Sequence, residues 1–415
     1  MGGILFVHNN FPAQFAFVAA ALVRRGERVA AISSRTGRPI PGVELLQWRP
    51  VRDGTQGIYP PARSAEHDLI RARAAADCAL SLKARGFDPD VIVAHPYMGG
   101  PLFLKEVFPR ARHIVHGEFY YQPHGSDSDF DPEFAIHDFE NDLKIRAFNA
   151  TLAWAYAEAD AIVCPTAYQL SLLPPALRAR AQVIHEGVDT REARPIAEAW
   201  IGLSEGQKLD RKTPVITYVS RRFEPMRGFH ILMRALPRVL SEVPQAQVLM
   251  IGADDPNVYG LRAAPGTTWK RHFLAEMDGR VDPRRVHFTG PISRSALMAA
   301  LALSAAHVYY TYPFVLSWSV LEAMACECLV VGSDTAPVRD AIRHGHDGLL
   351  LDFFDVDGLS DTLIDACRRP EAFAGLRANA RRTVVERFDR AGVCLPRWLA
   401  LIDEARAASS DERSL

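Results

Sequence analysis

Short apolar runs alternate with longer amphipathic stretches along most of the chain. The opening shows the pattern once in full: an apolar run at residues 3–7, a polar turn, a helix-like stretch, and a second apolar run at residues 27–34. Pro12 stands where a helix can begin, because proline is tolerated in the first turn. Gly26 stands where that helix should end, and the two arginines before it suit the negative end of the helix dipole. The opening therefore predicts a βαβ unit.

The same alternation continues through both halves of the chain. Strand patterns that alternate with helical ones are typical of α/β folds with mostly parallel sheets. We therefore expect an α/β protein with two Rossmann-like parallel α/β domains. The predicted strands are residues 91–95, 113–116, 161–165 and 182–187 in the first half, and residues 215–220, 247–252, 286–290, 307–312 and 329–333 in the second.

The length of 415 residues favours two domains, because single hydrophobic cores stop growing at roughly 250 to 300 residues. The alternating pattern lapses into polar sequence between residues 190 and 213. We place an N-terminal domain at 1–190 and a C-terminal domain at 191–384, with a C-terminal helix at about 385–408 that packs back on the first domain. Ligands of such folds bind outside the carboxyl ends of the strands, so we expect the site in the cleft across which the two domains face each other.

Residues 124–142 form an irregular stretch that is dense in aspartate and phenylalanine. Long loops inside a domain are often functional, so this stretch is a candidate binding or oligomerising element. A solvated surface loop is an equally good interpretation of the same residues.

Composition and charge exclude several classes of protein. With 48% hydrophobic residues, 23% charged residues and a formal net charge of -1, the chain has no global field for nucleic acid. The first apolar run is too short for a signal peptide, and no run reaches the roughly 20 apolar residues that span a bilayer, so we expect a cytoplasmic protein. No basic amphipathic helix stands out in the first domain, so peripheral membrane contact is not indicated.

The six cysteines are scattered over the chain, which favours reduced thiols over a disulfide framework. The one close pair is Cys326 and Cys328. A metal site would need further ligands nearby, so we interpret this pair as two small buried residues.

Two arginines follow the first predicted strand of the second half. Residues 215–220 lead into Arg222 and Arg227, and a helix begins after Gly228. Guanidinium groups at a strand end and a helix N-terminus suit a diphosphate, because bidentate donors add to the positive end of the helix. A surface arginine cluster that is balanced by Glu224 is the competing interpretation.

A second strand end carries a candidate ligand for a sugar. Residues 307–312 lead through a loop that ends in Ser317-Trp318-Ser319 into a helix that carries Glu322 among apolar neighbours. A glutamate is costly to bury unpaired, so we expect it to face a polar partner such as a sugar diol. A surface glutamate on an ordinary amphipathic helix is the alternative.

Taken together, these segments resemble the retaining glycosyltransferases of family 4, which have the GT-B fold. Arg222 and Arg227 match the arginine and the basic residue of the family pattern arginine, four residues, lysine-glycine. Five matches in sequence order argue against chance. The other four are Glu186-Gly187-Val188-Asp189, which is similar to Asn-Gly-Val-Asp, and the segments VHFTGPIS, LEAMACECLVVGSD and DGLLLDFFDVDGLSDTL.

The resemblance implies roles for individual residues of the second half. Glu322 corresponds to the glutamate that binds the ribose hydroxyls, whereas the family's other glutamate, which contacts the donor sugar, is replaced by Phe314. Two family glycines are replaced by Ser317 and Cys328. The implied catalytic residues are Arg222 and Arg227, and the implied donor-binding residues are Ile292, Ser317, Trp318, Ser319 and Glu322.

Fewer residues of the first half match the family. Its glycine-rich opening loop is replaced by residues that include Asn10 and Gln14, which can hydrogen-bond an acceptor or the donor phosphates. His116 lies where many members carry a histidine that faces the donor sugar, and we place it with the catalytic residues. Glu118 is placed with Asn10 and Gln14 on the acceptor or donor-sugar side. Two further histidines at strand ends, His8 and His95, are interpreted as structural.

The resemblance implies a retaining glycosyltransferase of carbohydrate biosynthesis, which moves a sugar from a nucleoside-diphosphate sugar to an acceptor hydroxyl. No metal or cofactor is expected, because two cationic side chains and a helix N-terminus can stabilise the leaving diphosphate. The acceptor is a saccharide, a lipid-linked molecule or a small molecule. The base, the donor sugar and a homo-oligomeric state are left open.

Other functions fit the same architecture. A nucleotide-sugar epimerase or a phosphorylase uses two such domains, and the loss of a glutamate at Phe314 keeps a degenerate, non-catalytic sugar-nucleotide binding protein open. A dehydrogenase is disfavoured, because the opening loop lacks Gly-x-Gly-x-x-Gly.

Overall fold

The computed structural model describes residues 2–35, 37–203 and 206–414, which form two compact units. Unit 1 contains the chain up to Pro123, Ile136–Glu186 and the residues from Ala391 onward, and unit 2 contains His124–Ala135 and Gly187–Arg390. The chain therefore passes between the units four times. Two of these crossings lie near the expected boundaries at residues 190 and 385, and the domain assignment itself stays a prediction.

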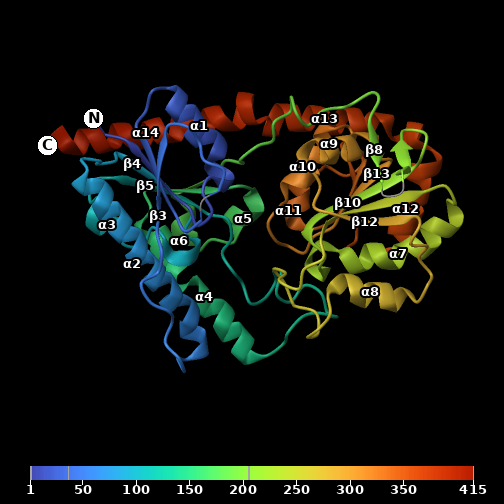
Figure 1. Ribbon diagram of the computed structural model, residues 1–415, viewed down its shortest axis with the longest axis horizontal. Coiled ribbons are helices and arrows are strands. Elements are labelled where there is room, and N and C mark those ends of the chain that lie inside the picture. The colour runs from blue at the N-terminus through green and yellow to red at the C-terminus, as the bar shows by residue number, and fades with distance from the viewer. Residues whose placement is uncertain (1, 36, 204–205, 415) are drawn as a thin grey trace. The chain divides into compact units, whose positions relative to one another are not determined.

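A seven-stranded parallel sheet forms the centre of unit 1, with helices on both faces (Figure 1). Successive side chains of a strand point to opposite faces, so Phe6 of β1 lies in one hydrophobic core and Leu5 lies in another. Burial on both faces explains why the strands read as apolar runs. In sheet order the strands are β3 (Val43–Gln47), β2 (Val29–Ser33), β1 (Ile4–Val7), β4 (Val91–Ala94), β5 (Arg112–His116), β6 (Ala161–Cys164) and β7 (Ala181–Val183).

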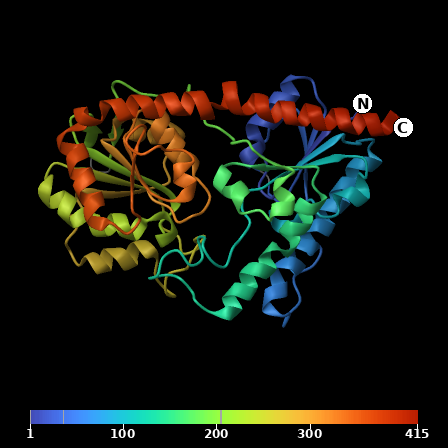
Figure 2. The same ribbon diagram turned by 180° about the vertical axis from the view of Figure 1, so that it is seen from behind.

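The C-terminal helix α14 packs on unit 1 beside α1 (Figure 2). The ring of Trp398 lies 6.2 Å from that of Phe15, and Arg25 forms an ion pair of 3.0 Å with Asp403. The helices of unit 1 are α1 (Ala16–Arg24), α2 (Arg63–Ala84), α3 (Leu104–Val107), α4 (Phe139–Glu158), α5 (Ala167–Ser171), α6 (Pro175–Arg178) and α14 (Leu395–Ser414), with short 3-10 turns η1 (Ala13–Phe15), η2 (Pro60–Ala62) and η3 (Tyr97–Gly99).

A six-stranded parallel sheet forms the centre of unit 2, and an antiparallel hairpin of β8 and β9 lies apart from it in the hydrogen-bond pattern. In sheet order the strands are β12 (Val286–Gly290), β11 (Gln247–Ala253), β10 (Val215–Arg222), β13 (Ala306–Tyr309), β14 (Val330–Ser333) and β15 (Leu349–Leu351), and the hairpin consists of β8 (Trp200–Gly202) and β9 (Lys208–Asp210).

Helices flank this second sheet as they do the first (Figure 1). They are α7 (Phe229–Glu242), α8 (Trp269–Met277), α9 (Arg294–Leu303), α10 (Trp318–Ala325), α11 (Ala336–Arg339), α12 (Val356–Arg368) and α13 (Ala374–Phe388), with 3-10 turns η5 (Pro225–Arg227) and η6 (Pro370–Phe373). A π-helical turn, η7 (Arg390–Cys394), follows α13 where the chain passes into unit 1. The α/β fold with two parallel sheets that the sequence predicts is thus confirmed.

All nine strands that we predicted by residue range are present, with the predicted ends at β12 and shifted ends at the others. The largest shift in unit 2 is at β13, which ends at Tyr309 because the chain then turns and the Tyr312 N–H donates to the Met226 carbonyl over 2.9 Å. Strands β3, β15 and the β8–β9 hairpin were not predicted. The hairpin lies in the polar stretch of residues 190–213, where no apolar run marks it.

The helix expected at about 385–408 is interrupted. Helix α13 ends at Phe388, whose carbonyl accepts from the Val188 N–H over 3.0 Å, and the Arg390 N–H donates to the Val188 carbonyl over 2.9 Å. This parallel bridge requires extended backbone at Asp389, so the helix cannot continue through it. The interruption coincides with the passage of the chain from unit 2 to unit 1.

The cysteines are free thiols, as the sequence predicts. Cys326 and Cys328 are both buried, and burial raises the pKa of Cys326 to about 12 and that of Cys328 to about 11. Such thiols are chemically inert packing residues, which confirms their interpretation.

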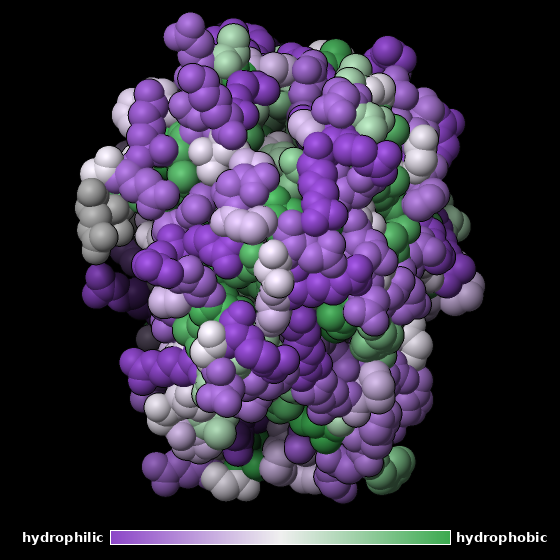
Figure 3. Space-filling model, turned by 90° about the vertical axis from the view of Figure 1, so that its right-hand side faces the viewer, coloured by the Kyte–Doolittle hydropathy of each residue, from purple (hydrophilic) through white to green (hydrophobic). Residues whose placement is uncertain are grey.

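The surface drawn in Figure 3 is mostly hydrophilic, and hydrophobic residues are scattered over it. Among the described residues, none of the helices has the length and hydropathy that crossing a membrane would require.

Candidate functional site

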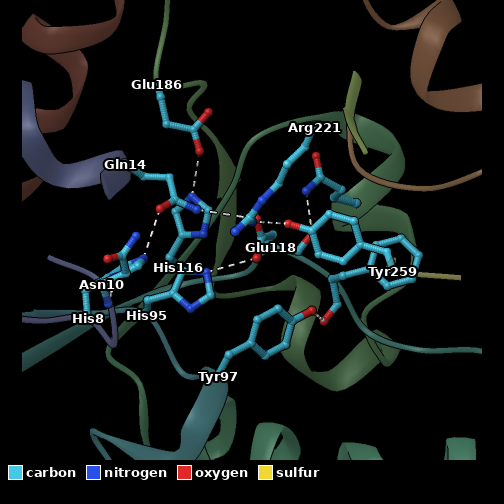
Figure 4. A network of polar contacts seen from close by, with 12 residues as sticks. His8, Asn10, Gln14, His95, Tyr97, His116, Glu118, Glu186, Arg221 and Tyr259 are labelled. Atoms are coloured by element: carbon cyan, nitrogen blue, oxygen red, sulfur yellow. Dashed lines mark hydrogen bonds and ion pairs between the residues drawn. The ribbon is translucent and has the colours of Figure 1, made fainter. Parts of the chain in front are cut away.

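Three histidines stand side by side at the carboxyl edge of the unit 1 sheet (Figure 4). His8 follows β1, His95 follows β4 and His116 ends β5, and these three neighbouring strands pair in a register that gives the histidines equivalent positions. The ring centroids are 4.8 Å apart for His8 and His95, and 5.4 Å apart for His95 and His116. His8 and His95 thus belong to one polar cluster with His116. Each of these histidines stands at the end of an apolar strand, and this shared position is the sequence signal from which the cluster could have been predicted.

Glu118 is the centre of a hydrogen-bond network on this cluster (Figure 4). Its carboxylate lies 3.0 Å from Nε2 of His95 and accepts from Nε2 of Gln14 over 3.4 Å. Burial alone would raise the pKa of Glu118, but the charge of His95 and its hydrogen bond lower it below its usual range. Oε1 of Gln14 in turn lies 2.9 Å from Nε2 of His8, whose Nδ1 accepts from the Asn10 N–H over 2.8 Å. The predicted trio of Asn10, Gln14 and Glu118 is therefore one network, which Asn10 joins through its backbone.

His116 is held by a carboxylate that the sequence analysis did not select as a site residue. Its Nε2 lies 2.9 Å from Oε1 of Glu186, and both side chains are buried. Burial would raise the pKa of Glu186, but the hydrogen bond from His116 and the charge of His185 lower it to about 2. Trp398 stacks on His116 with an interplanar angle of 6°. The imidazole is therefore fixed in orientation, and its Nδ1 is buried with no hydrogen-bond partner among the described residues.

In unit 2, Arg227 is fixed at the carboxyl end of β13. It ends the turn η5, and the next residue, Gly228, has φ +67°, a left-handed conformation in which a Cβ would lie 2.2 Å from Cβ of Tyr310. Only glycine fits there. Nη1 of Arg227 donates to Oγ1 of Thr311 over 3.0 Å and to the carbonyl of Val315 over 2.9 Å. The turn and these two bonds place the guanidinium on the loop between β13 and α10.

Arg222 lies at the same carboxyl edge of the unit 2 sheet as Arg227, but on the side of β11. It ends β10, and its Nε lies 3.2 Å from Oδ2 of Asp255, just beyond β11. Strand β10 lies between β11 and β13, so the two predicted arginines flank the end of one central strand. The neighbouring Arg221 donates to the Tyr259 hydroxyl over 2.8 Å (Figure 4).

The loop after β13 ends in a capped helix N-terminus. Ser317 is the N-cap of α10: its Oγ accepts from the Ser319 N–H over 3.4 Å, and its own N–H donates to the Tyr309 hydroxyl over 2.6 Å. Trp318 is 37% exposed, whereas Ser319 is buried and Ile292 is partly buried against the core of unit 2. A capped N-terminus with an adjacent arginine is a favourable place for an anion.

Glu322 faces a protein partner that the sequence analysis missed. It is only 5% exposed, and Arg294 at the start of α9 binds its Oε1 while Nε of Arg294 lies 3.0 Å from Oε2 of Glu192. Burial raises the pKa of Glu322, and the charge of Arg294 partly offsets this. The surface-glutamate alternative is therefore wrong. Its expected role toward ribose hydroxyls stays a prediction.

One group of side chains in the described residues has the geometry of a metal site. Ligand atoms of Asp131, Glu133 and His230 lie within 4.8 Å of one another. Each already has a protein partner: Asp131 binds His230 at 3.1 Å and the Tyr312 hydroxyl, and Glu133 forms an ion pair of 2.7 Å with Arg234. These contacts favour a structural network over a metal centre.

Solved structures show that the fold is GT-B, with two Rossmann-like parallel α/β domains. A sucrose-phosphate synthase from Thermosynechococcus elongatus superimposes with a TM-score of 0.72 and 16% identity, covering 98% of this chain and 100% of that one. The Anabaena protein HepE in complex with UDP and glucose gives a TM-score of 0.65 at 16% identity, covering 97% and 100%.

Family comparisons cover most of the chain in two parts. The Glycosyl transferase family 4 group matches residues 25–193, and the Glycosyl transferases group 1 matches residues 213–369. The chain therefore belongs to the family 4 glycosyltransferases, as the motifs predict.

Curated relatives match over about half of the chain. A D-inositol 3-phosphate glycosyltransferase of Mycolicibacterium smegmatis is 31% identical over 52% of this chain and 47% of its own. A phosphatidyl-myo-inositol mannosyltransferase of the same organism is 28% identical over 52% and 50%. The chain thus spans about half the length of the curated relatives that it matches.

Proposed function

We propose that this protein is a retaining glycosyltransferase that moves a sugar from a nucleoside-diphosphate sugar to an acceptor hydroxyl without a metal ion. The observation that carries this proposal is the group of Arg222, Arg227 and the N-terminus of α10 at one edge of the unit 2 sheet, with Glu322 on the same helix. Positive charge beside a buried carboxylate suits a ligand that combines a diphosphate with a diol.

The arginines would stabilise the leaving group. Breaking the bond between the anomeric carbon and the diphosphate leaves negative charge on a phosphate oxygen, and preorganised donors are commonly the largest catalytic contribution at such a charge. Arg227 is preorganised by its bonds to Thr311 and Val315, and Arg222 by Asp255. Two guanidinium groups in place of a cation support transfer without a bound metal.

Glu322 would bind the ribose. A carboxylate accepts hydrogen bonds from two adjacent hydroxyls, and Arg294 orients the buried Glu322 carboxylate and opposes the rise in its pKa that burial causes. The base is best tested first with uridine, because HepE, which shares the fold, is solved with UDP and with UDP-glucose.

The network of unit 1 would receive the acceptor hydroxyl or the transferred sugar. Glu118 is an ionised acceptor between His95 and Gln14, and burial lowers the pKa of His8 well below its usual value, so His8 is neutral. Such a network can both accept and donate hydrogen bonds. The names of the curated relatives make D-inositol 3-phosphate and phosphatidylinositol the first acceptors to test.

The test begins with binding. The free energy of unfolding should rise by about 2.7 kcal/mol when the correct nucleoside diphosphate is present at a hundredfold excess over its Kd. Thermal unfolding with UDP, GDP, ADP and dTDP measures this, with the Arg222→Ala protein as the matched control. Stabilisation by none of the four would contradict the proposed site.

Turnover is tested with the sugar conjugate of the nucleotide that binds, in the presence of EDTA. We expect a glycosylated acceptor whose anomeric configuration, determined by NMR, is the same as that of the donor. An epimerised donor without acceptor consumption would instead identify an epimerase. Tight nucleotide binding with neither transfer nor donor hydrolysis would identify a non-catalytic binding protein.

A further inference from the structure

Residues 124–135 pack into unit 2, although unit 1 residues precede and follow them in the chain. Phe130 lies 5.2 Å from the ring of Tyr312 and 5.1 Å from that of Phe353. Phe134 lies 5.1 Å from Trp269. Phe130 and Phe134 thus pack against buried rings of unit 2, so this segment is no solvated surface loop.

Polar bonds fix the same segment along the loop that follows β13. Asp131 is 2% exposed and accepts from the Tyr312 hydroxyl over 2.6 Å. Ser126 is 1% exposed, and its hydroxyl lies 3.4 Å from the Pro313 carbonyl. Consecutive residues of the β13–α10 loop thus bind residues on both sides of Asp127.

Asp127 differs from the other two aspartates of this segment. Asp131 is bound by Tyr312, and both oxygens of Asp129 accept from the Gly125 N–H, at 2.9 and 3.0 Å. Among the described contacts, Asp127 has the Ser126 hydroxyl at 3.2 Å and its own backbone N–H. Burial raises the pKa of Asp127 to about 6, and the nearby charge of Arg227 opposes this rise.

The other carboxylate on which Arg227 acts is already occupied. Glu224 is 2% exposed, and its Oε2 accepts from the Gly260 N–H over 2.9 Å. The loop of residues 312–319 carries no acidic residue of its own. Ser126 and Asp131 hold Asp127 along the loop whose Val315 carbonyl accepts from Arg227. Asp127 is therefore the aspartate of this segment that has acceptor capacity to spare near the arginine proposed to bind the diphosphate.

We propose that Asp127 is a donor-binding residue, whose carboxylate accepts hydrogen bonds from the hydroxyls of the transferred sugar. This inference rests on the proposed function. In a nucleotide sugar the sugar is bonded directly to the diphosphate. A carboxylate near Arg227, which we propose binds the diphosphate, is therefore placed to contact the sugar. The carboxylate selects a neutral sugar with free hydroxyls and disfavours a uronic acid, whose own carboxylate would be repelled.

A comparison of paired ligands tests this role. Calorimetry gives the Kd of UDP and UDP-glucose, and in parallel of GDP and GDP-mannose, for the wild type, Asp127→Asn and Asp127→Ala. A charged hydrogen bond contributes about 1.5–3 kcal/mol. Both variants should therefore lose tenfold or more in affinity for the matching sugar conjugate, and should keep or gain affinity for the free nucleoside diphosphate. UDP-glucuronic acid should bind these variants no worse than the wild type.

Asp357→Asn is the matched control, because it removes the same charge from an exposed position of unit 2 (91% exposed side chain). It should leave both affinities unchanged. An equal loss of affinity for the free nucleotide and its conjugate would overturn the inference, since Asp127 would then act only on Arg227. Unchanged affinities for both ligands would overturn it as well. A wild type that binds none of these nucleotides would instead refute the proposed function, which distinguishes the two failures.

Discussion

The guanidinium of Arg227 lies over the ring of Phe314, with its central carbon 5.3 Å from the ring centroid. A cation over an aromatic face is attracted by the ring quadrupole, by about 0.5–2 kcal/mol depending on desolvation. The same guanidinium donates to Thr311 and Val315. Phe314, which the family resemblance places at the position of a glutamate, thus helps to orient the arginine that we assign to the diphosphate.

Replacing Arg227 should remove turnover while the protein stays folded. The loss of one preorganised donor at a developing charge costs roughly 2.7–4 kcal/mol, so Arg227→Ala should lower kcat by about 10² to 10³. Arg227→Lys keeps the charge but lacks the planar, bidentate guanidinium group. Its kcat should therefore lie between that of Arg227→Ala and that of the wild type. The measurement is kcat at saturating donor, with thermal unfolding to verify the fold.

Arg284→Ala is the control for the arginine variants, because its side chain is 88% exposed in unit 2. It should have wild-type kcat. Near-normal turnover of Arg227→Ala would remove this residue from the site.

Replacing Glu322 should weaken nucleotide binding through the ribose. Glu322→Ala removes the acceptor and leaves Arg294 paired with Glu192 alone. We expect about a tenfold rise or more in the Kd of the nucleoside diphosphate, because hydrogen bonds to a charged group contribute about 1.5–3 kcal/mol. The Kd of inorganic pyrophosphate, which has no ribose, should not rise. Calorimetry measures both, and parallel losses for the two ligands would show that Glu322 acts on the phosphate site instead.

Glu186 should make the stability of unit 1 depend on pH. Its pKa is lowered to about 2 in the folded protein, chiefly by His116 against the opposing effect of burial. A carboxyl group whose pKa is lower in the folded than in the unfolded protein stabilises the folded state. This contribution is complete above the pKa of the unfolded state, about 4.5, and is lost as pH falls toward the pKa of the folded state. Between pH 5.5 and 2, the free energy of unfolding of the wild type should therefore fall by up to about 3 kcal/mol more than that of Glu186→Gln.

Urea unfolding at several pH values in this range measures the difference between the two proteins. At pH 7 the glutamine variant should be the less stable protein, because the buried pair is broken, and the gap should narrow as pH falls. A gap that stays constant with pH would contradict the lowered pKa of Glu186.

Local patterns in the sequence were sufficient to predict Arg222, Arg227 and Glu322 as candidates. These residues follow apolar runs at fixed spacing, and the runs are strands because they are buried on both faces. Arg294 was missed, because its contact with Glu322 joins the first residue of α9 to the middle of α10, 28 residues apart in sequence, and no periodicity marks such a pair.

Contacts that depend on strand order or on the path of a loop were beyond the sequence. His8 and His95 meet only because β4 inserts next to β1, with β2 and β3 on the other side. Ser126 and Asp131, on either side of Asp127, bind Pro313 and Tyr312 only because residues 124–135 leave unit 1 and pack into unit 2. Within a dense run of aspartates, the local sequence does not indicate which side chain accepts from a turn, which one is bound by a distant residue and which one can still bind a ligand.

The proposed role of Asp127 predicts that sugar binding depends on pH. Burial raises its pKa to about 6, with Asp129 adding to the rise and Arg227 and Ser126 opposing it. The ionised carboxylate is the form that accepts from sugar hydroxyls, so affinity should be full above this pKa and fall below it. If only the ionised form binds the sugar, the affinity for UDP-glucose relative to UDP should drop about tenfold between pH 7.5 and 5.

The comparison with Asp127→Asn isolates Asp127, because the terminal phosphate of free UDP, which titrates at about pH 6, changes the ratio of the two affinities alike in both proteins. In Asp127→Asn the ratio should be lower than in the wild type at pH 7.5, and it should lack the additional fall of about tenfold that the wild type shows toward pH 5. A wild-type ratio that does not change across this range would mean that the Asp127 carboxylate does not contact the sugar. A ratio that changes equally in the asparagine variant would assign the titration to another group.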